Sequence, residues 1–521
     1  MDKKTKSLLV LSSLFFLLII AWQWLPLADA SPALVCEVPG DFGTIQAAVA
    51  DPDCETINVG NGIFTENVTI DRMVTIAGQG ADHTEVNGNA SDSVFTMATE
   101  DLVTLKDLKI TNGFADSGGG ISNVNGMVVI ENSTISGNSA SFRGGGIFNQ
   151  SAFGSASMTI IDSVLSDNSA EVRGGGLENE GDDATVTIVD STFDNNSASE
   201  GGGIYNLGTV SIDNSLLNNN SATQGGGVYN SGLFTSTNST YIGNSAVEKG
   251  GGIHNASGFG NVTVTLSTLN DNSASEGGGI YNEGEEVAIN ESILEDNFAQ
   301  WGAGIYNLEG STATAANSTL SGNEADTEGG GIWNSGMMNL FNSTLSGNIV
   351  YHPIGTSSML GGGIYNSSGS TTIQNSTLND NSAGIAGNSI FNNSGNVALG
   401  NSILTNNNTE GAPENCAGDD VTSEGYNLES GNTCNLTAVG DMTDTDPLLS
   451  PLVDNGGETP THALLTGSPA IDAGNCPGED ADQRGFSRPV DMLGVPNAAD
   501  ACDMGAYEVH YVIYLPFMPH Y

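Results

Sequence analysis

The chain has 521 residues, of which 61 are Asp or Glu and only 11 are Lys or Arg, so its formal net charge at pH 7 is −50 and its sequence pI is about 4.1. Proteins that bind nucleic acids neutralise phosphates with Lys and Arg, and anionic lipid surfaces also attract positive charge. The composition therefore argues against both classes of partner, whereas an acidic surface keeps a secreted protein soluble.

Residues 1–30 are predicted to be a secretory signal peptide. Three lysines lie in residues 1–6, residues 8–22 are mostly apolar, and Ala28-Asp29-Ala30 is a small-x-small cleavage site, which places cleavage after Ala30. A retained anchor is the alternative, because residues 8–27 have about the length that spans a bilayer. We therefore expect a secreted or cell-surface protein with no membrane span once the signal is removed.

Six cysteines lie outside the repeats described below. Extracellular cysteines usually form disulfides, and proximity in the sequence suggests three local pairs. The predicted pairs are Cys36 with Cys54, Cys416 with Cys434, and Cys476 with Cys502. They would staple the two ends of the fold.

Residues 31–80 are predicted to form an N-terminal cap and the first coils. Thr44 to Ala50 has the pattern of a short amphipathic helix, and short alternating segments follow it. The sequence from Gly43-Thr-Ile-Gln-Ala-Ala-Val to the segment that begins Ile57-Asn-Val-Gly resembles the opening of pectin esterases and other β-helices of the pectate-lyase-like fold. The resemblance implies a right-handed coil.

Residues 81–406 are predicted to be a repeat domain. Between Gly118 and Asn392 the chain repeats a phrase like Asn-Ser-Thr-Leu-Ser-Gly-Asn-Ser-Ala, then a few variable residues, then Gly-Gly-Gly-Ile-Tyr-Asn. The glycine blocks recur from Gly118 to Gly387 with a mean period of about 27 residues, which is typical of a solenoid. Each repeat holds only short pieces of period-two alternation, so we predict an all-β, single-stranded, parallel β-helix.

Aligned repeats place like residues in columns. We predict two buried aliphatic columns and two asparagine ladders, because coils stacked at about 4.8 Å put identical side chains in contact. The first aliphatic column is Ile135, Leu165, Phe193, Leu217, Ile242, Leu269, Leu294, Leu320, Leu345 and Leu378; the second is Ile147, Leu177, Ile204, Val228, Ile253, Ile280, Ile305, Ile332 and Ile364. The first ladder is Asn138, Asn168, Asn196, Asn220, Asn244, Asn272, Asn297, Asn323, Asn348 and Asn381; the second is Asn149, Asn179, Asn206, Asn230, Asn255, Asn282, Asn307, Asn334 and Asn366.

Only Gly, Asn and Asp precede the first asparagine ladder, as at Gly137, Asp167 and Asn195. These residues tolerate a positive φ, so the aspartates are predicted to be turn residues, with calcium ligands as the alternative. We expect no other cofactor. Just before the glycine blocks, Arg173 and Glu200 would be neighbours on adjacent coils, as would Lys249 and Glu276, and would form exposed ion pairs.

Residues 407–508 have a different composition. The segments Glu414-Asn-Cys-Ala-Gly, Gly467-Ser-Pro-Ala-Ile-Asp-Ala-Gly, Asp482-Gln-Arg-Gly and Cys502-Asp-Met-Gly-Ala-Tyr-Glu are similar to the C-terminal region of bacterial choice-of-anchor Q surface proteins. This resemblance implies a secreted or surface-displayed β-helix. Residues 509–521 form a separate apolar tail. The Gly-Gly-Gly-Ile and Asn motifs also resemble the repeats of polymorphic outer membrane proteins.

No catalytic residue is predicted. Enzymes of this fold that cleave acidic polysaccharides use clustered carboxylates with an Arg or Lys, yet Lys249 is the sole cation between Arg173 and Arg484. His462 and Arg484 stand in motifs of the C-terminal region, where packing or hydrogen bonding is the expected role. A polysaccharide lyase or glycoside hydrolase is the enzymatic alternative.

One outward-pointing column is a candidate binding site. An exposed strip of rings about 5 Å apart could stack on the sugars of a neutral polysaccharide or contact a partner surface; mutual stacking within the column is the structural alternative. The strip comprises Phe148, Tyr205, Tyr229, His254, Tyr281, Tyr306, Trp333, Tyr365 and Phe391, with Glu178 as an interruption. We therefore expect a non-enzymatic display, adhesion or glycan-binding rod; a structural envelope component is favoured if the strip is buried.

Overall fold

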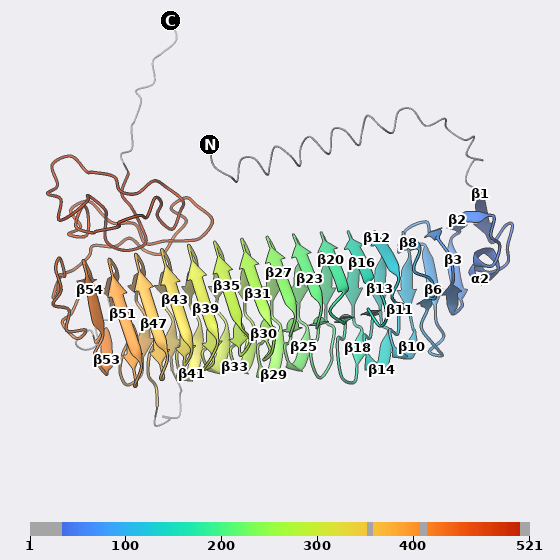
Figure 1. Ribbon diagram of the computed structural model, residues 1–521, viewed down its shortest axis with the longest axis horizontal. Helices are drawn as coiled ribbons and strands as arrows, with labels where there is room; N and C mark the ends of the chain where they lie inside the picture. Colours follow the sequence, from blue (N-terminus) through green and yellow to red (C-terminus); the bar gives the residue numbers. More distant parts are fainter. Residues whose placement is uncertain (1–33, 352–357, 407–413, 511–521) are drawn as a thin grey trace, which may run out of the picture.

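A computed structural model describes residues 34–351, 358–406 and 414–510 of the chain as an all-β parallel β-helix. The coils stack into an elongated rod in which every ladder between named strands is parallel (Figure 1). Each complete coil of the central region crosses sheets A, B, D and C in that order, and sheet D consists of two short pieces. The predicted fold class is therefore confirmed.

Sheet A is the longest wall of the rod. Its 16 strands pair in the following order: β1 Leu34–Val38, β2 Cys54–Val59, β5 Val74–Ala77, β8 Leu102–Lys106, β12 Met127–Glu131, β16 Ala156–Ile161, β20 Ala184–Val189, β23 Thr209–Asp213, β27 Leu233–Thr237, β31 Asn261–Thr265, β35 Glu286–Asn290, β39 Thr312–Ala316, β43 Met337–Phe341, β47 Ser370–Gln374, β51 Asn396–Gly400 and β54 Thr422–Gly425.

Sheet B forms the second wall, and its strands are short because a turn follows within a few residues. Its 15 strands are β3 Gly62–Thr65, β6 Thr84–Asn87, β9 Lys109–Thr111, β13 Thr134–Ser136, β17 Val164–Ser166, β21 Thr192–Asp194, β24 Leu216–Asn218, β28 Thr240–Ile242, β32 Thr268–Asn270, β36 Ile293–Glu295, β40 Thr319–Ser321, β44 Thr344–Ser346, β48 Thr377–Asn379, β52 Ile403–Thr405 and β55 Leu428–Glu429.

Sheets D and C complete each coil on either side of the glycine block. Sheet D contains β10 Phe114–Ser117, β14 Ser139–Arg143 and β18 Ser169–Ala170 in one piece and β25 Ser221–Gln224, β29 Ser245–Lys249, β33 Ser273–Glu276, β37 Phe298–Trp301, β41 Glu324–Glu328, β45 Ile349–Val350 and β49 Ser382–Ala383 in the other. The 14 strands of sheet C are β4 Val68–Ile70, β7 Phe95–Met97, β11 Ile121–Val124, β15 Ile147–Gln150, β19 Leu177–Glu180, β22 Ile204–Asn206, β26 Val228–Asn230, β30 Ile253–Asn255, β34 Ile280–Asn282, β38 Ile305–Asn307, β42 Ile332–Asn334, β46 Ile364–Asn366, β50 Ile390–Asn392 and β53 Cys416–Gly418.

One continuous apolar core runs the length of the coil. The second predicted aliphatic column, on sheet C, is fully buried from Ile147 to Ile364. On sheet B, Leu165, Phe193 and Leu217 are also fully buried and stack in register. Strands this short are stable because each one bonds to the same strand of the coils on both sides, which leaves few backbone groups unpaired.

The prediction that Ile242 belongs to the sheet B column is wrong. Tyr241 pairs with Leu217 and Leu269 and is fully buried, whereas Ile242 pairs with Asn218 and points outward. The ladder sets the register, and within a strand side chains alternate between the two faces, so the bulkier aromatic ring lies inside. Ser236 on sheet A stands where other coils carry an aliphatic residue such as Ile212, which leaves room for the ring.

Replacing Tyr241 with Phe is expected to raise the free energy of unfolding by about 1 kcal/mol, because the buried hydroxyl makes no hydrogen bond of ordinary geometry although Ser236 lies nearby. Replacing it with Leu should instead lower that free energy by about 2 kcal/mol through the cavity that remains. Urea unfolding followed by circular dichroism measures both. A Phe variant less stable than the parent would show that the hydroxyl is bonded.

Both predicted asparagine ladders are present inside the coil. In the first, each Nδ2 donates to the Oδ1 of the next asparagine at 2.8–3.1 Å and also to a backbone carbonyl. In the second the corresponding Nδ2–Oδ1 distances are 2.7–3.0 Å. The residue before the first ladder has a positive φ in each coil, for example 53° at Asp167 and 54° at Asn195, so these aspartates are turn residues as predicted.

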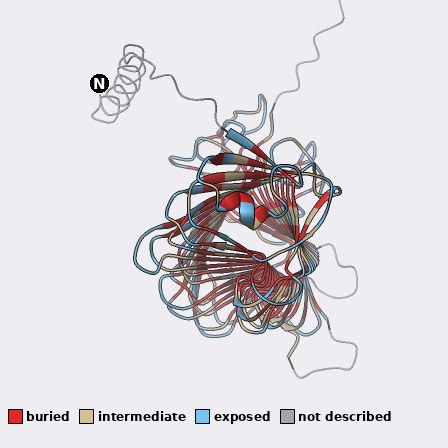
Figure 2. Ribbon diagram, turned by 90° about the vertical axis from the view of Figure 1, so that its right-hand side faces the viewer, coloured by how far each residue is buried: buried red, intermediate tan, exposed pale blue. Residues whose placement is uncertain are grey.

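The N-terminal end of the coil is covered by α2 (Ile45–Val49), which lies across the opening of the rod (Figure 2). Thr44 caps this helix by accepting the Ala47 amide, and the Glu66 carboxylate accepts the amides of Ile45 and Gln46. Its buried face closes the apolar core. The disulfide Cys36–Cys54 joins the first two strands of sheet A beside the helix.

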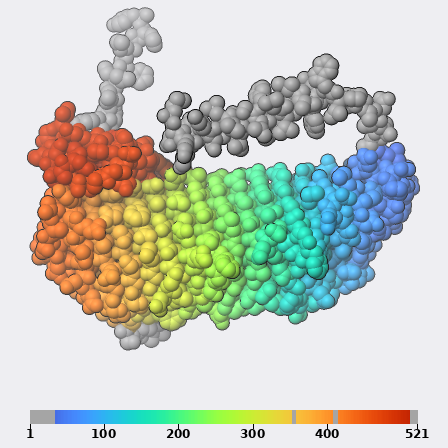
Figure 3. All heavy atoms as spheres, in the orientation of Figure 1, coloured from blue at the N-terminus to red at the C-terminus, as the bar shows by residue number. Residues whose placement is uncertain are grey.

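Residues 430–510 fold back along the side of the last coils and pack on the A–B edge (Figures 1 and 3). Thr344 donates to the Gln483 side chain, Thr377 accepts the Ala506 amide, and the Thr319 hydroxyl donates to the Pro460 carbonyl. The disulfides Cys416–Cys434 and Cys476–Cys502 hold this end, as predicted. The predicted signal peptide and nearly all of the apolar tail lie outside the described residues.

Candidate functional site

The aromatic column runs along the outward side of sheet C with one member per coil. Strand pairing places Tyr205 beside Tyr229, and the column then continues through His254 and Tyr281 to Trp333. Neighbouring ring centroids from Tyr205 to Phe391 are 4.2–6.2 Å apart, and most pairs are stacked. The column is therefore continuous, as the spacing of the repeats implies.

A binding strip requires exposed rings, and most members of the column do not meet this condition. Phe148, Tyr205, His254, Tyr281, Tyr306 and Tyr365 are buried, and Tyr229, Trp333 and Phe391 are half-buried. The cause is the glycine block: Gly201 has a φ of 65°, and a Cβ there would lie 2.4 Å from the Ile204 carbonyl oxygen. This tight reversal brings the end of sheet D over the rings of sheet C.

Three cations at the end of the sheet D segment cover the rings. The guanidinium of Arg143 lies 5.1 Å from the Phe148 ring centroid, that of Arg173 lies 4.9 Å from Tyr205, and the Lys249 ammonium lies 4.7 Å from Tyr281. Cation–π contacts at these distances stabilise both partners. Among the described repeats, these partly exposed cations thus contact the rings of the fold itself.

The predicted ion pair of Arg173 is correct, whereas that of Lys249 is wrong. Arg173 Nε lies 3.2 Å from Glu200 Oε2, as expected. Lys249 pairs with Glu283 at 2.9 Å and not with Glu276. Glu283 directly follows the ladder residue Asn282, so it approaches the aromatic column from the side opposite to sheet D. Comparing residues at a single repeat position does not reveal such a contact.

Glu178 takes the place of an aromatic ring on β19. Its side chain is fully buried, and neither of its carboxylate oxygens has a hydrogen-bond partner. Burial raises the pKa of Glu178 to about 8, which outweighs the attraction of Arg143, whose Nη1 lies 4.0 Å away because that guanidinium bonds to Glu180. The residue therefore carries its proton at neutral pH.

His254 is the other member of the column that is not Phe, Tyr or Trp, and it is fully buried. Burial lowers its pKa, so the ring is neutral, and its Nε2 lies 3.1 Å from Glu283 Oε1. This hydrogen bond holds the pKa of Glu283 down at about 2. The geometry describes a neutral imidazole that donates to an ionised carboxylate, an arrangement that fixes both side chains.

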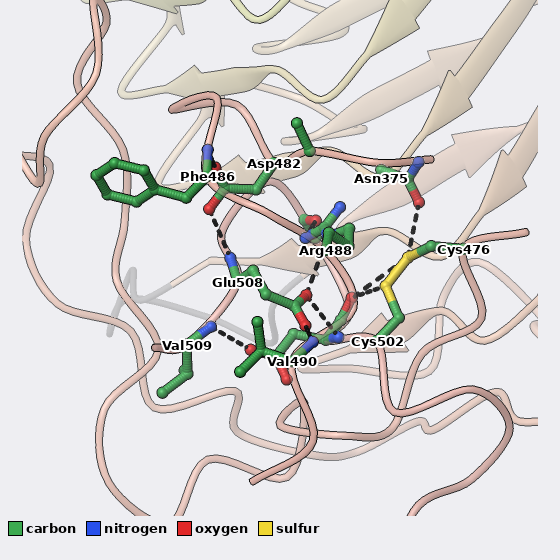
Figure 4. A network of polar contacts seen from close by, with 12 residues as sticks. Asn375, Cys476, Asp482, Phe486, Arg488, Val490, Cys502, Glu508 and Val509 are labelled. Atoms are coloured by element: carbon green, nitrogen blue, oxygen red, sulfur yellow. Dashed lines mark hydrogen bonds and ion pairs between the residues drawn. A yellow bond between two sulfur atoms is a disulfide. The ribbon is translucent and has the colours of Figure 1, made fainter. Parts of the chain in front are cut away.

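The C-terminal motif residues serve as hydrogen-bonding and packing groups. His462 lies 2.8 Å from the Ser450 carbonyl and 2.9 Å from the Ser346 hydroxyl, and burial lowers its pKa. Arg484 bonds to Asp482 and stacks on Tyr507 at 3.5 Å. Figure 4 shows the adjoining network, in which buried Arg488 bonds to buried Glu508 close to the Cys476–Cys502 disulfide.

Within residues 34–351, 358–406 and 414–510, no group of three or more His, Cys, Asp or Glu side chains is arranged to hold a metal ion. Across the same residues no helix is long and apolar enough to cross a bilayer. The paired acids Asp182 and Asp183 lie in an exposed loop after β19.

Comparison with protein families matches residues 190–207 to the Chlamydia polymorphic membrane protein repeat. The matched residues run from the turn before β21 to the strand β22, so they include one asparagine of each ladder and one glycine block. A search of curated proteins finds no match. The similarity covers residues 190–207, which is less than one coil of the rod because no sheet A strand is included.

Proposed function

We propose that the protein is a non-enzymatic secreted or cell-surface rod that displays binding loops away from its point of attachment. The observation that carries this proposal is that the aromatic, cationic and asparagine side chains of the repeats contact each other within the rod. Their aromatic residues stack on each other, their cations cover those rings, and their asparagines bond inside the coil, so the repeats build a stiff scaffold. Binding groups on a rigid scaffold are usually found in its loops.

Three further observations support a location outside the cytoplasm. The disulfides at both ends are typical of oxidising compartments. Residues 190–207, part of one coil, are similar to the Chlamydia polymorphic membrane protein repeat. The C-terminal region resembles that of choice-of-anchor Q surface proteins, and in this chain it packs beside the last coils, where it would precede an anchoring device.

A structural envelope component is the second candidate, and the burial of the aromatic column favours it. A column of stacked rings with covering cations stiffens the rod and needs no ligand. The two candidates differ in whether the outer surface binds a partner. In the column only Tyr229, Trp333 and Phe391 are half-buried, which leaves little ring area for stacking a glycan.

The test uses the full chain produced with its N-terminal segment. We expect an antibody against the rod to label intact cells, and we expect incubation with polygalacturonate or a neutral β-glucan to yield no new reducing ends or unsaturated products. Retention of the chain in the cytoplasm would refute the proposed location. Release of oligosaccharides would refute the non-enzymatic function and revive the lyase or hydrolase alternative.

A further inference from the structure

Two inserted loops on the C–A edge of the rod each present a phenylalanine to solvent. Residues 151–155 follow β15 and residues 256–260 follow β30, at the same corner of their coils. The Phe153 side chain is fully exposed, and Phe259 is 81% exposed. Phe142 on β14 is also exposed, but it lies on sheet D, whereas the remaining rings of these coils are packed into the column or the core.

Hydrogen bonds to the backbone of both loops hold them in place. The Asn125 Oδ1 accepts the amides of Ala152, Phe153 and Gly154 at 2.7, 3.1 and 3.3 Å. In the second loop the Ala256 amide donates to the Asn230 carbonyl at 2.7 Å, and the Asn261 side chain donates to the Phe259 carbonyl. A partner that meets loops fixed in this way loses little free energy in ordering them.

The two loops follow strands of the same sheet C column, so they lie along one edge of the rod. Their coils are four ladder steps apart, from Asn149 through Asn179, Asn206 and Asn230 to Asn255. At about 4.8 Å per step the separation is about 19 Å. Exposed Met127 and Leu233, each at the start of a sheet A strand on the same edge, extend the apolar surface around each ring.

The charges on this edge are negative. Asp182 and Asp183 are exposed on the loop of an intervening coil, and Glu285 and Glu286 are exposed on the coil after Phe259. Such an edge repels anionic lipids and polyanions and attracts Lys and Arg. The C-terminal region does not cover it, because that region contacts the A–B edge of later coils.

We propose that this edge binds a cationic amphipathic helix of a partner protein. The apolar side chains of that helix would pack on Phe153 and Phe259, and its basic side chains would pair with the acidic loops between and beyond these two residues. A helix rises about 1.5 Å per residue, so about 13 residues span the two rings. The inference rests on the proposed display function and names the class of partner. Adjacent acids and apolar rings together select a basic, apolar-faced ligand over a neutral one.

The probe is a labelled 18-residue helical peptide of leucine and lysine, titrated with the full chain by fluorescence anisotropy. We expect saturable binding that the double variant Phe153→Ser/Phe259→Ser weakens at least tenfold. The double variant Asp182→Asn/Asp183→Asn should weaken binding severalfold and reduce its salt dependence. Val247→Ser is the matched control, since Val247 is 73% exposed on β29, and this change should leave binding unaltered.

The proposal is overturned if the parent chain does not bind the peptide or if the double Phe variant binds it as the parent does. Unfolding curves that coincide with that of the parent exclude misfolding as the cause of lost binding. Antibody labelling of intact cells with the double Phe variant separates the two proposals, because surface display should persist when the docking edge is removed.

Discussion

Replacing Asn244 with Asp is expected to lower the free energy of unfolding by about 3–5 kcal/mol at pH 7. The Asn244 Nδ2 donates to the Leu217 carbonyl and to the Asn272 Oδ1, both at 2.9 Å. A carboxylate in this place has no proton to donate, so it faces two acceptors in a site that water does not reach.

The experiment measures urea unfolding of the full chain at pH 7 and at pH 4. The loss should be smaller at pH 4, because protonation restores one donor and removes the buried charge. Asn396→Asp is the matched control, since Asn396 is exposed on β51 and the same change there should alter the free energy of unfolding by less than about 0.5 kcal/mol. Equal effects at the two positions would contradict the ladder as a source of stability.

Much of the coil could be predicted because stacked coils place the same type of residue at the same repeat position. A column such as Ile147 to Ile364 is visible in the sequence, since every coil offers the same place to the same side chain. The same logic identified both asparagine ladders and the positive φ at Asp167. It failed at Tyr241, where the aliphatic neighbour Ile242 looked like the better match and only the alternation within the strand identifies the buried residue.

The candidate site was less predictable because it depends on what covers a surface. Alternation correctly places Tyr205 on the outward face of sheet C, but only the three-dimensional path of the glycine turn shows that Arg173 lies over the ring. A cation just before the glycine block is the signal that could have revealed it. Contacts such as Thr344 with Gln483 join residues 139 positions apart, and no repeat pattern predicts them.

Replacing Glu178 with Gln should remove a large part of the pH dependence of stability. Burial raises the pKa of Glu178 from 4.5 to about 8. Between pH 4.5 and pH 8 the folded chain therefore keeps a proton on this carboxyl, whereas the unfolded chain has released it. The unfolded state therefore binds fewer protons, and the free energy of unfolding falls as the pH rises from 4.5 to 8. A tenfold difference in proton affinity is worth about 1.4 kcal/mol, so the total loss is about 4–5 kcal/mol.

The Gln variant keeps the size of the side chain and cannot ionise. We expect it to match the parent near pH 4 and to exceed it in stability by several kcal/mol at pH 9, with thermal or urea unfolding as the measurement. Glu171→Gln, at an exposed position of the same coil, is the control and should leave the curve of the parent unchanged. The charges that face Glu178 are Arg143, Arg173, Glu180 and Glu200, and all of them remain in the variant. Stability curves of the parent and the Gln variant that run parallel across this pH range would contradict the prediction. They would mean that the Glu178 carboxyl ionises in the folded rod as easily as in water. Contact with solvent, or with Arg143 at less than 4.0 Å, would be the cause.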